Sequence, residues 1–184
     1  MKIDVYALMK DGGYCTKVFN FFIKNRSLMK VNSALFEKHL NKSVSNLEFA
    51  NFILSEHEYS IKEKLPNKKF YDWCIIIYYY SLYHAVLALI TKVGFTSKNH
   101  IASICALTLF YYHKKNLLKK EDLEFIINNF DLKSEEVEFL FSSKDLRERA
   151  SYKVDEDFNL QSANHLLKKT ADFVNKVKSI LEST

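Results

Sequence analysis

The chain has very little glycine and proline, with three Gly and one Pro among 184 residues. Tight hairpin turns, Gly-rich dinucleotide-binding loops and P-loops all require glycine, so this scarcity excludes turn-rich all-β folds, Rossmann folds and P-loop enzymes. The chain is 48% hydrophobic and 27% charged, which also excludes a disordered or fibrous protein. We therefore expect long helices with short connections, at a length typical of one domain.

Cysteine is also scarce, and its pattern excludes a disulfide framework. The three residues Cys15, Cys74 and Cys105 are odd in number, far apart and without a CxxC spacing. Such residues are typical of buried thiols in a reducing compartment. The first residues also lack the apolar stretch of a signal peptide. The sequence therefore predicts a cytoplasmic protein.

One long stretch, residues 73–90, has no formally charged residue and has almost the length of a membrane span. Its centre contains several tyrosines and His84, which are costly in the middle of a bilayer. Membrane insertion stays open as the lesser alternative. The better prediction is the buried central helix of a soluble protein with no membrane contact.

Charge is unevenly distributed around a net value of +5. Residues 71–120 have a balance of +5, whereas residues 121–156 have a balance of −6. A net charge of this size does not indicate nucleic acid without a concentrated basic stripe. The two sectors are either solvated helix faces or complementary surfaces of an oligomer.

Hydrophobic periodicity close to 3.6 residues predicts helices over most of the chain. Gly94 should end the central helix, and Thr96 or Ser97 should begin the next one. Residues 1–13 should be irregular, and no segment has the alternation of a strand. We expect helices at about 14–24, 33–64, 68–93, 98–115, 121–130, 134–151 and 160–181, the last with a core stripe of Leu160, Ala163, Leu167, Thr170, Val174, Val177 and Leu181. The fold class is therefore all-α, an antiparallel up-and-down bundle of five to six helices over residues 31–184, with residues 1–30 as an appendage containing a short helix.

Metal ligands on helices should share a face at i and i+4 or belong to CxxC knuckles. The six histidines form no such pair: His39, His57, His84, His100, His113 and His165. The chain also lacks a Gly-rich phosphate loop and a nucleophile elbow. The sequence therefore predicts no metal site and no cofactor.

Two segments carry recognisable motifs. Residues 78–89 read YYYSLYHAVLAL and are followed by Gly94 and then Lys98-Asn99-His100, while residues 146–152 read LRERASY. Together they resemble the HEPN family (higher eukaryote and prokaryote nucleotide-binding domains). In prokaryotic members a pattern like YYxxxHxxxALL is followed by a glycine, a loop with a basic residue and a histidine, and then by LRxxAxY and a last amphipathic helix. The resemblance covers about residues 19–181.

The resemblance implies a helical dimer and, in many members, a metal-independent endoribonuclease of toxin–antitoxin or defence systems. Their signature is an arginine followed, after four to six residues, by a histidine. Arg147 matches the arginine, but Tyr152 stands where the histidine is expected. A tyrosine with its ordinary pKa near 10 is a poor base at pH 7. We therefore expect a degenerate motif that binds a phosphate through Arg147 without robust ribonuclease activity.

Three functions remain open at this stage. The first is a nucleotide- or RNA-binding partner of a minimal nucleotidyltransferase in a toxin–antitoxin or defence module, acting as a homodimer through the helices at 68–93 and 134–151. The second is a metal-independent endoribonuclease toxin that uses Arg147 and a displaced histidine, His84 or His100. The third is a ligand-free structural interaction protein. The candidate ligand-binding residues are Arg147, Tyr152, His84, Tyr80 and His100, and the candidate catalytic residues among them are Arg147, Tyr152 and His84.

Each candidate also has a purely structural interpretation. His84 has the alternative of a satisfied core histidine, and His100 that of anchoring a loop through a hydrogen bond. Tyr152 could close the end of the bundle with its hydroxyl paired. The three consecutive tyrosines at 78–80 should be mostly core, but a helix must point one of them elsewhere.

Overall fold

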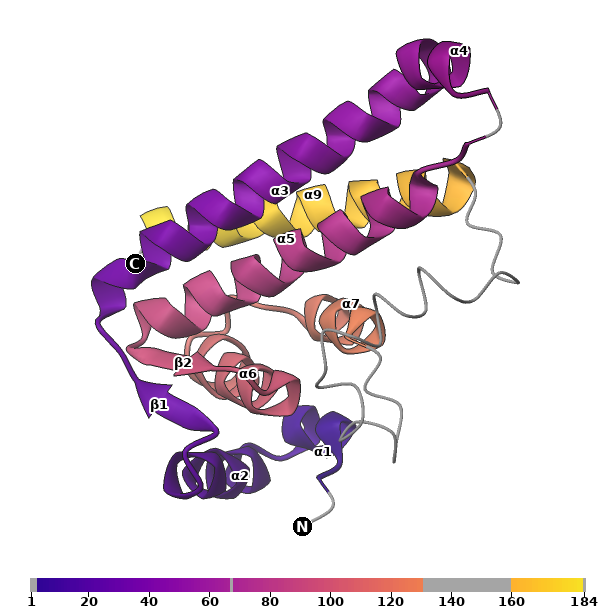
Figure 1. The fold of residues 1–184 in the computed structure, drawn as a ribbon. Helices are drawn as coiled ribbons and strands as arrows, with labels where there is room; N and C mark the ends of the chain where they lie inside the picture. Colours follow the sequence, from indigo (N-terminus) through magenta and orange to yellow (C-terminus); the bar gives the residue numbers. More distant parts are fainter. Residues whose placement is uncertain (1–2, 67, 131–159, 184) are drawn as a thin grey trace.

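The computed structural model describes residues 3–66, 68–130 and 160–183. Their regular secondary structure is helical, apart from one small two-stranded sheet (Figure 1). The predicted all-α fold class is confirmed. The expected helix at about 134–151 lies outside the described residues.

Three long helices form the upper part of the molecule in Figure 1. They are α3 (Phe36–Glu56), α5 (Tyr71–Lys92) and α9 (Leu160–Glu182). Helix α5 packs along α3 and also against α9, so it is the central helix, as its apolar sequence predicts. The predicted core stripe of α9 is largely buried, at Ala163, Thr170, Val174, Val177 and Leu181.

The entry into α3 is a short 3-10 turn, η1 (Ser33–Leu35), capped by Asn32. The Asn32 side-chain oxygen accepts a hydrogen bond of 2.9 Å from the Ala34 amide. At its other end α3 continues through a π-helical segment, η2 (His57–Ile61), into α4 (Lys62–Lys64). The helical stretch therefore ends before Pro66, as predicted, because proline cannot continue a helix.

Two short helices near the N-terminus pack below the long ones. They are α1 (Val5–Lys10) and α2 (Gly12–Lys24), so the expectation of an irregular 1–13 segment is wrong. The physical reason is capping. Asp4 and Asp11 each accept two backbone N–H groups of the helix that follows, which lets Gly12 and Gly13 begin a helix instead of breaking one. The short helix predicted at 14–24 is confirmed.

The remaining helices are α6 (His100–Leu107), its π-helical continuation η3 (Thr108–Lys114), and α7 (Lys120–Asn129). Asn99 caps α6 by accepting a 2.9 Å hydrogen bond from the Ala102 amide, so the expected caps at Thr96 or Ser97 are wrong. Both of those residues belong to a strand instead, β2 (Phe95–Ser97).

The two-stranded sheet joins distant parts of the chain. β1 (Leu28–Lys30) pairs antiparallel with β2, and Leu28 lies opposite Ser97. Strands of three residues are too short to show alternation, which is why the sequence predicts none. Gly94 has φ +86°, a conformation that glycine adopts without strain, and it turns the chain from α5 into β2.

The core has two clusters of buried side chains. The larger one is formed by α1, α2, α6, α7 and the C-terminal halves of α5 and α9. The smaller one lies between α3, α5 and α9 and consists of Ala50, Leu54, Tyr71, Cys74, Tyr78 and Ala163. Helices α1 and α2 thus share a core with the long helices, while the division of the chain at residue 31 stays a prediction.

Among the described residues, α5 alone is long and apolar enough to cross a membrane. However, 61% of its most apolar window is buried inside the protein. This burial is what a core helix requires, and it supports the prediction of a buried central helix.

Candidate functional site

The described residues include three of the five predicted site residues. Tyr80 and His84 lie on α5, and His100 is the first residue of α6. Arg147 and Tyr152 lie outside the described residues, so their predicted roles stay predictions. The site can therefore be built from the α5 and α6 side.

The three consecutive tyrosines of α5 have three different environments. Tyr78 is fully buried, and its hydroxyl donates a 2.9 Å hydrogen bond to the Asn51 side-chain oxygen on α3. Tyr79 is partly buried and faces α6, whereas Tyr80 is 42% exposed. The prediction that one of the three points away from the core is confirmed, and the exposed one is Tyr80.

Four rings gather where α5 meets α6, and we call Tyr79, Tyr83, His100 and Phe130 the tyrosine–histidine cluster. The Tyr79 hydroxyl and His100 Nε2 are 3.0 Å apart. The His100 ring lies 4.7 Å from the Phe130 ring and 5.3 Å from the Tyr83 ring, measured between centroids. The Asn99 cap fixes the first turn of α6 and thereby places His100 in this cluster.

Burial controls the protonation of this cluster. It lowers the pKa of His100 to about 4 and raises the pKa of Tyr79, so both groups are neutral at pH 7. A neutral imidazole bonded to a tyrosine hydroxyl fixes the start of α6 against α5. This is the geometry of the loop-anchoring alternative for His100.

His84 faces a residue that sequence reasoning missed. Its Nδ1 atom is 3.2 Å from Nδ1 of His39 on α3, and the two rings are nearly parallel, 24° apart. Burial, together with the neighbouring His39 and Lys42, lowers the pKa of His84 to about 4. The pKa of His39 is lowered by burial and by Lys42. We call His39 and His84 the histidine pair; both members are neutral at pH 7.

Two serines hold the helices together beside the histidine pair. The Ser43 hydroxyl donates 2.8 Å to the Ser81 carbonyl, and the Ser81 hydroxyl donates 2.8 Å to the Ser43 carbonyl. His39 precedes Ser43 by four residues, and His84 follows Ser81 by three. An antiparallel contact between the serines therefore brings the histidines together. This matching spacing is the sequence signal that could have revealed His39.

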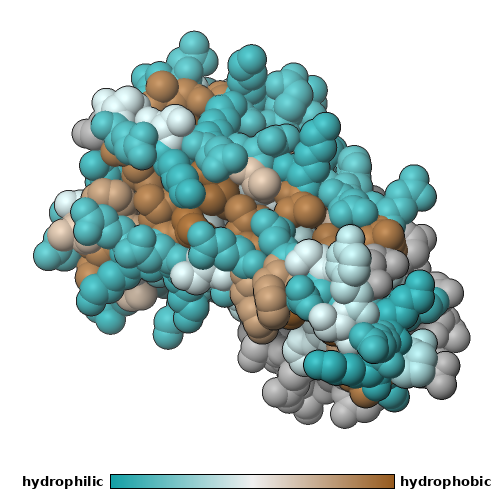
Figure 2. Space-filling model, turned by 90° about the horizontal axis from the view of Figure 1, so that it is seen from above, coloured by the Kyte–Doolittle hydropathy of each residue, from teal (hydrophilic) through white to brown (hydrophobic). Residues whose placement is uncertain are grey.

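The face of α5 that carries Tyr80 is open. Trp73, Ile77, Tyr80 and His84 recur at three- and four-residue steps and so share one side of the helix. Trp73 is 49% exposed, and Phe49 and Phe52 of α3 are exposed as well. Hydrophobic residues also reach the surface between hydrophilic ones in the view of Figure 2. Tyr80 and the histidine pair are thus accessible from outside.

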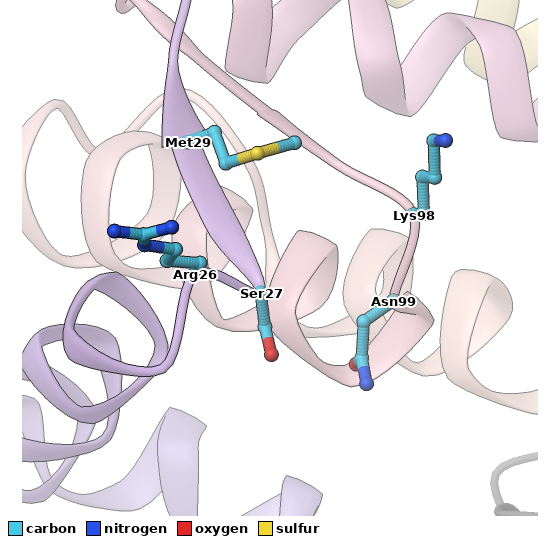
Figure 3. A pocket seen from close by; sticks show the side chains of 5 residues that line it. All are labelled: Arg26, Ser27, Met29, Lys98 and Asn99. Atoms are coloured by element: carbon cyan, nitrogen blue, oxygen red, sulfur yellow. The ribbon is translucent and has the colours of Figure 1, made fainter.

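A shallow open pocket of about 270 Å³ lies between β1 and the residues before α6 (Figure 3). It is lined by Arg26, Ser27, Met29, Lys98 and Asn99. It therefore carries two positive charges and no carboxylate. In Figure 3, however, the Arg26 side chain extends to the left and the Lys98 side chain extends upward, so their charges do not converge on one point.

No group of three or more metal-ligating side chains forms within the described parts of the chain. The three cysteines are buried, and the Sγ atoms of Cys15 and Cys105 are 4.0 Å apart. Burial raises the pKa of Cys74 to about 11, so its thiol is unreactive at pH 7. The candidate site is therefore made of neutral aromatic and imidazole groups.

No family model matches the chain. The chain is similar to a protein of Methanocaldococcus jannaschii that bears the name "Putative toxin MJ0142". The two are 26% identical over 155 residues, which are 84% of this chain and 90% of that protein. The similarity thus extends over nearly the whole of both chains and is not confined to one motif. It suggests a toxin-type family, with which the HEPN resemblance is compatible.

Proposed function

We propose that the protein is the toxin-type component of a cytoplasmic toxin–antitoxin or defence module. In this proposal it is a HEPN-like homodimer that binds a nucleotide or RNA and pairs with a minimal nucleotidyltransferase. The observation that carries the proposal is the similarity to "Putative toxin MJ0142" of M. jannaschii over 84% of this chain. The ordered motifs, from the tyrosine run to Arg147 and Tyr152, support its finer parts.

The accessible side of α5 suits such a ligand. Tyr80 offers an exposed ring on which a base can stack, and stacking of this kind is tolerant of sequence. His84 lies on the same side of the helix and is neutral, so it can donate or accept a hydrogen bond. Arg147 is the group that we propose for a phosphate. The exposed Trp73 and Tyr80 also support association with a second copy through α5.

Expression of the full chain in a bacterial host is expected to arrest growth, because a toxin acts on a component that the host needs. Arg147→Ala and His84→Ala should relieve the arrest, and His165→Ala should not. His165 is an exposed residue of α9 and serves as the matched control. The measurement is the number of surviving colonies at equal soluble protein levels. Normal growth at a high level of soluble wild-type protein contradicts the proposal.

A second candidate function, a metal-independent endoribonuclease, is favoured by one observation. The histidine pair holds two neutral imidazoles at an accessible place, and neutral imidazole is the usual general base. However, a base with a pKa of about 4 takes a proton from a ribose hydroxyl poorly. The first candidate is therefore preferred.

We accordingly expect no robust cleavage when purified protein is incubated with RNA at pH 7 without metal ions. The measurement is gel electrophoresis of a structured and an unstructured RNA beside His84→Ala, Arg147→Ala and Tyr152→Phe. Cleavage by the wild type that His84→Ala abolishes and Tyr152→Phe preserves would establish the second candidate. Cleavage abolished by both would make Tyr152 a catalytic residue.

A further inference from the structure

The histidine pair has the spacing of two ligands of one metal ion. Zinc and similar ions bind imidazole nitrogens at about 2.0–2.1 Å. Two nitrogens 3.2 Å apart then subtend an angle of about 100° at the ion, close to the tetrahedral value. An ion can therefore replace the contact between the two Nδ1 atoms once each ring turns to point its Nδ1 lone pair at the ion.

The scaffold holds this spacing before any ion arrives. Ser43 and Ser81 are fully buried, and their two hydrogen bonds fix the approach of α3 and α5 within one turn of each histidine. The rings are partly buried, which restricts their rotation. Little conformational freedom remains to be lost on binding, and pre-organisation of this kind strengthens a site.

The ligand atoms are also available. A metal-bound imidazole must be neutral, and burial keeps both rings neutral at pH 7. Neither Nε2 atom is hydrogen-bonded to another described residue, so the remaining proton of each ring can reside there. The pair is reachable from solvent, which allows water to complete the coordination shell.

The surroundings select the class of ion. The groups that face the pair are the Tyr83 ring, 5.5 Å from His84, and the charge of Lys42, and no described carboxylate contributes to the shifted pKa of either histidine. Without oxygen ligands the site does not suit Ca²⁺ or Mg²⁺. Imidazole suits Zn²⁺, Cu²⁺ and Ni²⁺. Lys42 is exposed, so its repulsion of a cation is weakened by solvent but not removed.

We propose that His39 and His84 together chelate one transition-metal ion of the Zn²⁺, Ni²⁺ or Cu²⁺ class at the α3–α5 interface. The ion joins α3 and α5, two of the three long helices of the described fold, and completes its shell with water. The site shares His84 with the proposed ligand site, but its formation needs only the two helices, so metal binding can be tested without the growth assay. Cu²⁺ binds most tightly in the series, as for other nitrogen sites.

Zn²⁺ added to the full chain at pH 7 is expected to bind with one ion per chain in isothermal titration calorimetry. His39→Ala and His84→Ala should each weaken binding by about tenfold or more, because one of two ligands is lost. His165→Ala should leave the affinity unchanged, and Lys42→Gln should raise it by removing a nearby positive charge. Equal Zn²⁺ affinity of the wild type and the His39→Ala/His84→Ala double variant overturns the proposal.

A second readout does not depend on variants that could misfold. In nitrogen–proton correlation spectra of wild-type protein labelled with ¹⁵N, Zn²⁺ should shift the Nδ1 resonances of His39 and His84 and leave their Nε2 atoms protonated. The His165 resonances should not follow the same saturation curve. Unchanged Nδ1 resonances of the histidine pair at saturating Zn²⁺ overturn the proposal, whatever the growth assay shows.

Discussion

Acidification from pH 7 to pH 4 is expected to remove about 3 kcal/mol from the free energy of unfolding through two histidines alone. Burial lowers the pKa of both His84 and His100 to about 4, from an ordinary value near 6.5. The unfolded chain therefore binds a proton at each residue as the pH falls below 6.5, while the folded chain does not. The expected loss in the free energy of unfolding is smaller than the two pKa differences alone would give, because His84 is partly open to solvent and its charge is screened there.

The direction of the effect follows from the depressed pKa values. The stability contributed by the neutral rings is fully present above pH 6.5 and is lost progressively as the pH falls to about 4. His39 and Lys42 disfavour the protonated form of His84. The His100 ring is surrounded by the neutral rings of Tyr79, Tyr83 and Phe130. Within the described chain, none of these neighbours is an acid that could stabilise an imidazolium at pH 5.

Urea unfolding between pH 7 and pH 4.5 measures this loss. The wild type should lose stability already between pH 6.5 and pH 5, above the range in which most carboxylates protonate. His84→Gln and His100→Gln should each flatten that part of the profile, whereas the exposed control His165→Gln should not. Identical slopes in the wild type and in both buried-site variants would show that neither histidine is held neutral.

Most helices could be predicted from the sequence because their periodicity reports which face is buried. The stripe of α9 illustrates this: Ala163, Val174 and Val177 repeat at helical spacing and are all buried against the other helices. Gly94 likewise ends α5 for a local reason, its positive φ. Such features depend on a few neighbouring residues, so a single sequence contains them.

The features that could not be predicted depend on residues far apart in the chain. The pairing of β1 with β2 joins Leu28 to Ser97, and neither strand is long enough to have a pattern of its own. Helix α1 depends on its Asp4 cap, which offsets the weak helical signal of six residues. The boundaries of α6 were misplaced because Asn99, and not Ser97, caps that helix.

Tyr80, His84 and His100 could be chosen as candidates from the sequence, but the residues that contact His84 and His100 could not. The motif that includes Tyr80, His84 and His100 follows from their resemblance to a family pattern. The partners of these residues, Tyr79 for His100 and His39 for His84, depend on how α3, α5 and α6 pack. A search for metal ligands at i and i+4 on one helix does not detect a pair contributed by two helices.

Tyr78→Ala is expected to cost about 3–5 kcal/mol of the free energy of unfolding, the largest effect of a single substitution proposed for this protein. Tyr78 is fully buried in the smaller core cluster, where α3, α5 and α9 meet. Its removal leaves a cavity between three helices, and the long helices cannot close around it without moving the Ser43–Ser81 contact one turn away. The substitution also removes the hydrogen bond that the Tyr78 hydroxyl donates to the Asn51 side chain.

Two further variants separate the ring from the hydroxyl. Tyr78→Phe should cost only about 1 kcal/mol, because it keeps the packed ring and removes one hydrogen bond to the partly buried Asn51. Tyr80→Ala, on the same helix but exposed, should change stability by about 0.5 kcal/mol or less. Urea unfolding of the three variants provides the measurement. A loss in Tyr80→Ala equal to that in Tyr78→Ala would contradict the packing, because it would mean that Tyr80 is buried and that α5 has turned its open side toward the core.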